Sequence, residues 1–186
     1  MARESPDVKA SDLAEEAELI LDRALSSGDG SSPRNRARGN ISAWPNDIWA
    51  GNESQSITPY GPIAFLAGWA HFRTENYETA IERLEQAADD TGWPGRGLAY
   101  PLLAMSFHKL GREQEAASAF QRSQIFFDQQ LNDRFRQPRE TPRLRWFDWI
   151  DFLILHRESQ VLLQGETPTE DPRLRKLKVL AKAAIE

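Results

Sequence analysis

Between residues 61 and 130 the sequence carries one pattern twice, and this repetition limits the folds open to the chain more than any other feature. In each copy, a helix-like segment is followed by a second one in which small, large and small residues recur at helical spacing. Because Ala116 is the equivalent of Ala80, the period is 36 residues. The pattern is carried by Ala80, Leu84 and Ala87 in the first copy and by Ala116, Phe120 and Ser123 in the second. Repeats of this length are typical of helical hairpins stacked into a solenoid.

Small residues within the repeats have a packing role. Two helices of a hairpin approach closely only where neither carries bulk, and larger side chains fill the space beside the contact. The small positions are Gly68, Ala80, Ala104 and Ala116, and the large ones are Leu84, Phe107 and Phe120. The sequence therefore predicts one hairpin with helices over about 62–74 and 77–89, and another with helices over about 97–110 and 113–131.

With these residues the repeats resemble the tetratricopeptide repeat (TPR) family, whose hairpins follow Trp-x2-Leu-Gly-x2-Tyr and then Ala-x3-Phe. The matches are Gly68, Tyr77, Ala80, Leu84 and Ala87 in copy one and Tyr100, Leu103, Ala104, Phe107, Ala116 and Phe120 in copy two. Copy one departs from the pattern at Ala64, Ala67 and His71, and neither copy has the late proline in register. Residues 102–111 also resemble repeats of large bacterial multidomain proteins such as serine/threonine kinases. The resemblance covers about 70 residues and implies a scaffold or adaptor that binds other proteins.

Around the repeats we expect four regions. Residues 1–42 hold an N-terminal helix and a flexible, glycine-rich loop, residues 43–61 are irregular and aromatic, residues 62–131 are the two repeats, and residues 142–186 form a degenerate third hairpin with capping helices. The N-terminal helix reads equally well as half a repeat or as an unrelated amphipathic helix. The expected fold is all-α, a short right-handed TPR-like solenoid of about seven helices.

The helix predicted over about 142–164 is apolar nearly all round its centre, from Trp146 to Leu155. A helix of this kind has to be covered on two sides. Its covers are expected to be the second repeat and either the final helix or a second copy of the protein. The final helix, over about 172–185, has one apolar and one basic face, which suits a terminal cap or, as the alternative, an acidic membrane surface.

Composition and motifs exclude several functions. The chain has 186 residues, a net charge of −5, no cysteine and three histidines. The negative charge argues against a nucleic-acid partner, and no apolar run is long enough to span a bilayer. No catalytic or metal-binding motif is present, so we expect no enzyme activity, no catalytic residues, no metal and no cofactor. Without a signal peptide, the sequence predicts a cytoplasmic protein.

Two histidines were open to a structural interpretation. His71 occupies a position where the family packs an aromatic ring, so we expect it in the core. His156 falls near the end of a predicted helix, where a cation is favourable.

A binding groove is the best-supported functional feature. In the TPR family the first helix of each hairpin lines the concave face. The corresponding residues are Phe65, Trp69, Phe72 and Arg73 in copy one and Pro101, Met105, His108 and Lys109 in copy two. The family's carboxylate-gripping pattern is absent, and an apolar groove suits a peptide or an amphipathic partner helix. Two alternatives remain: the segment from Trp44 to Tyr60 covers the groove in cis, or the chain associates with itself as a homodimer.

Overall fold

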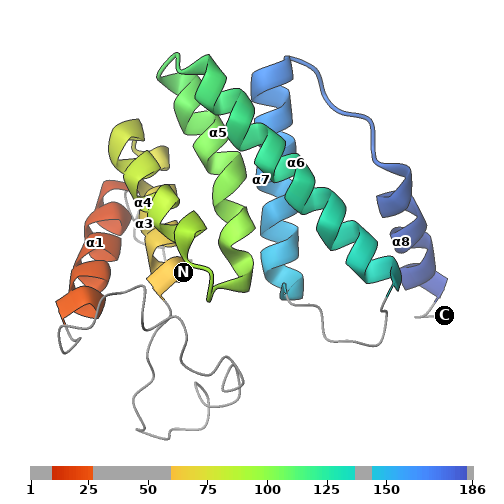
Figure 1. Cartoon of the computed structure of the whole chain (residues 1–186), viewed down its shortest axis with the longest axis horizontal. Coiled ribbons are helices and arrows are strands. Elements are labelled where there is room, and N and C mark those ends of the chain that lie inside the picture. Colours follow the sequence, from red (N-terminus) through yellow and green to blue (C-terminus); the bar gives the residue numbers. More distant parts are fainter. Residues whose placement is uncertain (1–9, 27–59, 137–143, 184–186) are drawn as a thin grey trace, which may run out of the picture.

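The computed structural model describes residues 10–26, 60–136 and 144–183, and most of these residues are helical (Figure 1). They form seven α-helices and one short 3-10 helix, η2, without any strand. The α-helices are α1 Ala10–Ser26, α3 Tyr60–Arg73, α4 Tyr77–Asp89, α5 Ala99–Lys109, α6 Glu113–Arg136, α7 Trp146–Gln164 and α8 Pro172–Ala183, with η2 at Pro94–Leu98. The all-α prediction is confirmed.

Helices α1 to α6 pack mainly on helices close to them along the chain, and α7 packs on α5, an arrangement consistent with a solenoid. Helices α3 and α4 form one hairpin and α5 and α6 another; α1 packs on α3, α4 on α5, and α5 on α7. Figure 1 shows this order from α1 at one end to α7, with α8 beside the C-terminal part of α6. Arg173 joins α8 to α6, because its guanidinium donates to Asp128 over 2.6 Å. The two hairpins predicted over about 62–89 and 97–131 are present as the α3–α4 and α5–α6 pairs.

Close approach of α3 and α4 depends on Gly68. A Cβ atom at this position would lie 2.6 Å from Cγ of Leu84 and 3.1 Å from the Leu84 backbone nitrogen. Leu84 is fully buried, as are the small residues Ala80 and Ala104. The core lies along the seam between the paired helices, where bulk on one helix meets a small residue on the other.

Several helix boundaries differ from the predicted ones. The second repeat begins with η2, because Pro94 starts a tight turn in which Gly97 lies under Phe126; a Cβ on Gly97 would be 2.4 Å from the ring. Helix α6 runs to Arg136, five residues beyond the predicted end at 131, since no helix-breaking residue comes before Pro138. Helix α7 ends at Gly165, whose φ of 73° is left-handed.

Glu18 ties α1 to the first repeat. Its carboxylate accepts hydrogen bonds from Arg83 Nε over 2.8 Å and from Arg83 Nη2 over 2.7 Å, and it lies 2.9 Å from His71 Nε2. Burial alone would raise the pKa of Glu18, but the hydrogen bonds from Arg83 and His71 outweigh it, so the pKa is lowered. His71, expected in the core, has only 12% of its side chain exposed and turns its imidazole toward this carboxylate.

We expect Glu18→Gln to loosen α1 by about 1 kcal/mol, because the amide cannot replace the charge-assisted bonds to Arg83 and His71. The measurement is amide hydrogen exchange in α1 at pH 7, with faster exchange of Leu21 as the expected result. Glu16→Gln is the matched control, since Glu16 is exposed on the same helix. Equal exchange in the two variants would contradict the anchoring role of Glu18.

Candidate binding groove

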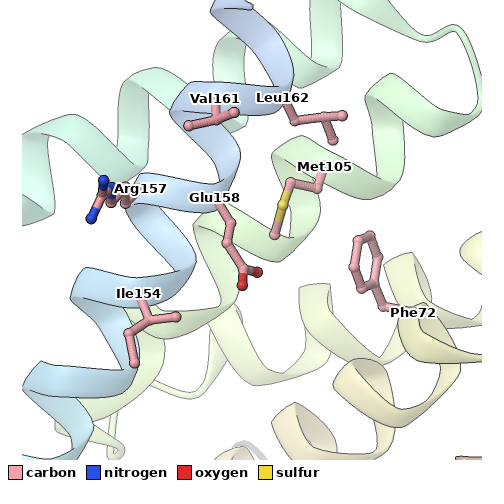
Figure 2. Close-up of a pocket in the computed structure, with 7 residues that line it drawn as sticks. All are labelled: Phe72, Met105, Ile154, Arg157, Glu158, Val161 and Leu162. Atoms are coloured by element: carbon pink, nitrogen blue, oxygen red, sulfur yellow. The ribbon is translucent and has the colours of Figure 1, made fainter. Parts of the chain in front are cut away.

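A groove of about 510 Å³ opens between the end of α3, the middle of α5 and the outer side of α7 (Figure 2). Its lining residues are Phe72 from α3, Met105 from α5, and Ile154, Arg157, Glu158, Val161 and Leu162 from α7. Three helices that are distant in sequence thus contribute to one surface. Five of the seven lining residues are apolar, so the groove is suited to apolar side chains.

The apolar part of the groove has a buried floor and an exposed wall. Met105 is buried in the floor, and Phe72 is half-buried with its ring edge-on to Tyr77 at 5.7 Å between centroids. Ile154 and Val161 form the wall, and their exposed fractions are 51% and 39%. Exposed apolar side chains beside a buried apolar floor are the arrangement found where another apolar surface docks.

One charged group faces the groove. Figure 2 shows the Glu158 carboxylate directed toward the space in front of Met105 and Phe72, whereas Arg157 points to the other side of α7. Glu158 makes no hydrogen bond or ion pair with any residue in the described part of the chain. An occupant with a cationic group beside its apolar residues would therefore complement this surface.

Of the predicted groove residues, the structure brings Phe72 and Met105 together in the groove. Phe65 belongs to the core instead, with its ring 5.7 Å from Trp69 and 5.6 Å from Trp93. Trp69 is half-buried beside it, and its indole nitrogen has no hydrogen-bond partner among the described residues. Phe65 therefore packs on Trp69 and on Trp93 in the turn after α4. Neither Phe65 nor Trp69 lines the groove.

The polar residues predicted for the groove lie outside its lining. Arg73 and Lys109 are exposed at the C-terminal ends of α3 and α5. His108 Nδ1 lies 3.1 Å from Glu113, so this imidazole faces the turn between α5 and α6. Pro101 is buried in the first turn of α5. Arg73 and Lys109 are the last residues of α3 and α5, so both cations lie at helix ends and neither lines the groove.

The wall formed by α7 was missed by sequence reasoning. The signal was present, because the apolar character of α7 all round its centre predicts a second covered face. In the structure, one face carries the buried residues Trp149, Phe152, Leu155, His156 and Ser159, and the other carries the exposed residues Phe147, Ile150, Ile154 and Val161. The final helix was expected as a possible cover, but α8 lies beside α6, and the outer apolar residues of α7 remain exposed.

The structure also brings together a serine and a histidine that lie far apart in sequence. Ser123 Oγ is 2.8 Å from His156 Nδ1, and both side chains are buried. The imidazole is enclosed by Phe120, Phe127 and Phe152, with ring centroids 5.8, 5.0 and 5.4 Å away. A substrate cannot reach a hydroxyl that has no exposed surface, so this pair is a packing contact of the core.

Burial keeps His156 uncharged. Desolvation among the aromatic rings lowers its pKa to about 4, although the nearby charge of Asp128 acts in the opposite direction. Its Nε2 atom has no hydrogen-bond partner among the described residues. The expectation that His156 carries a favourable positive charge at a helix end is therefore wrong, because the residue lies more than two turns before the end of α7 at Gln164 and faces the core.

Part of the predicted site lies outside the described residues. The segment expected to cover the groove, Trp44 to Tyr60, is described only at Tyr60, which begins α3 and donates a 2.6 Å hydrogen bond to Gln86. Cover by Trp44 and Trp49 therefore stays a prediction. Among the described residues, no group of three or more potential ligands could hold a metal ion. Within the same residues, no helix has the length and apolar character needed to cross a membrane.

Comparison with known proteins adds no further constraint. No protein-family model matches the sequence, and neither a curated protein nor a solved structure matches it.

Proposed function

We propose that this chain is a non-enzymatic, TPR-like interaction module that binds an amphipathic helix of a partner protein in the groove between α3, α5 and α7. The observation that carries the proposal is the combination of a buried apolar floor, Met105, with an exposed apolar wall, Ile154 and Val161. Leaving such a wall in water costs free energy that docking of an apolar surface recovers, at about 25 cal/mol per Å² of apolar area.

The chemistry of the groove also suggests what the partner helix looks like. Apolar residues at i, i+3, i+4 and i+7 would contact Ile154, Val161 and Phe72. A lysine or arginine at the edge of this stripe would face the Glu158 carboxylate, which is turned toward the groove (Figure 2). The preferred partner is therefore an amphipathic helix with a basic flank, in contrast to the C-terminal carboxylate that some TPR proteins grip.

The test is binding of a fluorescein-labelled synthetic helix with leucines at helical spacing and lysines along one flank. We expect Ile154→Asp to weaken binding at least about tenfold, because a charge in the wall would be desolvated by the docked helix. Ile125→Asp is the matched control, since Ile125 is the same residue type on α6 with an exposed fraction of 50%, against 51% for Ile154. Fluorescence anisotropy gives both dissociation constants.

Equal weakening by Ile154→Asp and Ile125→Asp would indicate non-specific hydrophobic binding and would contradict the proposal. Failure of the peptide to bind the wild type would also contradict it. Glu158→Gln adds a second readout. It should reduce the salt dependence of binding while leaving the apolar contacts in place, because screening acts on exposed charge pairs.

A further inference from the structure

Exposed apolar side chains lie on the outer sides of both α7 and α8. On α7 the exposed apolar residues Phe147, Ile150, Ile154 and Val161 recur at intervals of three, four and seven, so they form one stripe along the helix. On α8, Leu174 and Leu177 pack on the core, and Val179, with an exposed fraction of 64%, lies on the opposite side. Leu180, one residue further on, lies between these two faces with an exposed fraction of 53%. Helix α7 thus has a buried face and an exposed apolar face, and α8 exposes Val179 on the side away from the core.

The edge of the α7 stripe that carries Asp151 and Glu158 is opposite in charge to the basic flank of α8, while Arg157 lies on the other edge of α7. Asp151 and Glu158 flank the stripe of α7, and neither makes an ion pair with a residue that the structure describes. Arg175, Lys178 and Lys182 flank the stripe of α8. One carboxylate, Glu170, serves both Arg175, at 3.9 Å, and Lys178, so this flank keeps a surplus of positive charge.

The spacing of these charges also matches. Asp151 and Glu158 are seven residues apart, and so are Arg175 and Lys182. Seven residues of α-helix span about 10.5 Å, so both charge pairs can form at once if the two helices lie side by side. In an antiparallel register that places Asp151 opposite Lys182 and Glu158 opposite Arg175, Ile154 comes opposite Val179 and Ile150 opposite Ala183. A parallel register would place Ile154 opposite Lys178.

We infer that the occupant of the groove is α8 of a second copy of this chain, docked antiparallel along α7 and giving a homodimer with two equivalent α7–α8 contacts. The inference rests on the proposed function, since α8 is itself an amphipathic helix with a basic flank. A two-fold axis makes the contact reciprocal: α7 of each protomer receives α8 of the other, and the assembly closes as a dimer.

Reciprocity also has an energetic consequence. Stable interfaces bury about 1,200–2,000 Å² in total, and a single pair of short helices supplies only part of that area. Two α7–α8 contacts double the buried surface and cover the exposed side chains of Ile150, Ile154 and Val161 on α7. The dimer therefore supplies the second cover that the composition of α7 requires.

The experiment uses the full chain in sedimentation velocity over a range of concentrations and two charge-reversal variants. The first variant carries Asp151→Lys and Glu158→Lys, and the second carries Arg175→Glu and Lys182→Glu. We expect the wild type to dimerise and each variant alone to have a dimer dissociation constant raised at least about tenfold. Glu78→Lys with Glu82→Lys, a reversal of two exposed carboxylates on α4, is the matched control and should leave the dimer unchanged.

Mixing the two variants gives the decisive result. The mixture pairs a basic α7 with an acidic α8 and an acidic α7 with a basic α8, so a heterodimer should form although neither variant dimerises with itself. A single chain carrying all four substitutions should dimerise again for the same reason. Unfolding of α8 by the substitutions cannot imitate this outcome, because an unfolded helix would not be rescued by mixing.

A wild-type chain that stays monomeric at about 100 µM would overturn the inference. So would variants that dimerise as the wild type does, or a mixture that remains monomeric. The peptide titration separates this failure from failure of the proposed function. If the chain is monomeric but still binds the labelled helix through Ile154, the groove is a binding site and only the homodimer is refuted. If the chain neither dimerises nor binds the labelled helix, both proposals are refuted.

Discussion

Lowering the pH from 7 to 5 should reduce the free energy of unfolding by about 2 kcal/mol through His156 alone. The unfolded imidazole takes up a proton near its ordinary pKa of 6.5, whereas burial holds the pKa in the folded chain at about 4. Below pH 6.5 the unfolded state therefore binds more protons than the folded state, and stability falls with pH. The loss reaches about 3 kcal/mol near pH 4 and stops once the folded imidazole is also protonated.

The measurement is urea unfolding at pH 7 and pH 5, a window that lies above the range in which carboxylates take up most of their protons. His156→Phe combined with Ser123→Ala should abolish most of this pH dependence, because a phenyl ring suits the cage of Phe120, Phe127 and Phe152 and the serine loses its partner at the same time. His108→Gln is the matched control. His108 is half-buried beside Glu113 and lies outside the aromatic cluster.

Two outcomes would contradict this interpretation of His156. One is an equal loss of stability in the wild type and in the double variant between pH 7 and 5. The other is removal of the pH dependence by His108→Gln. Either result would place the acid-sensitive group elsewhere in the chain.

Gly68→Val should destabilise the fold by about 3 kcal/mol, the second large effect that we expect. Even a single Cβ at position 68 would lie 2.6 Å from Leu84 Cγ, and the nearby Leu84 backbone nitrogen cannot turn away as a side chain can. Gly68→Ala should cost less, since alanine recovers about 1 kcal/mol of helix propensity that glycine lacks. Urea unfolding at pH 7 measures both values.

Leu66→Val is the control for the β-branched side chain itself, because Leu66 lies on the same helix and is exposed. Leu84→Ala in the Gly68→Ala background gives the coupling. If Leu84 is the obstacle, the double variant loses less stability than the two single variants added together, because removing the isobutyl group makes room for the new methyl group. Additive losses would show that the two residues do not meet.

The residues of the groove show where sequence reasoning reached its limit. Phe72 and Met105 could be assigned to one surface, since both lie on the first helix of a repeat. Phe65 was assigned to the same surface but packs in the core against Trp93, a residue of the bend between repeats. Sequence gives the face on which a residue of a helix lies, but the path of a bend decides what covers that face.

The two polar pairs, one part-buried and one buried, could not have been found from spacing. Glu18 and Arg83 are 65 residues apart, and Ser123 and His156 are 33 apart. Neither interval belongs to the period of the repeat. Each pair forms because two helices are packed in one particular order, and that order brings a carboxylate to a guanidinium in one case and a hydroxyl to an imidazole in the other.

By itself, the sequence determined the helices and the hairpin pairs. The alternation of small and large residues around Ala80 and Ala116 acts locally, through the close approach of neighbouring helices, so it can be read without coordinates. The tertiary structure decided where α7 and α8 lie. Helix α8 lies against α6 through Arg173 and Asp128, and Ile154 and Val161 of α7 stay exposed as one wall of the groove. Contacts between helices that are distant along the chain depend on the summed packing of all the helices between them, which no short pattern encodes.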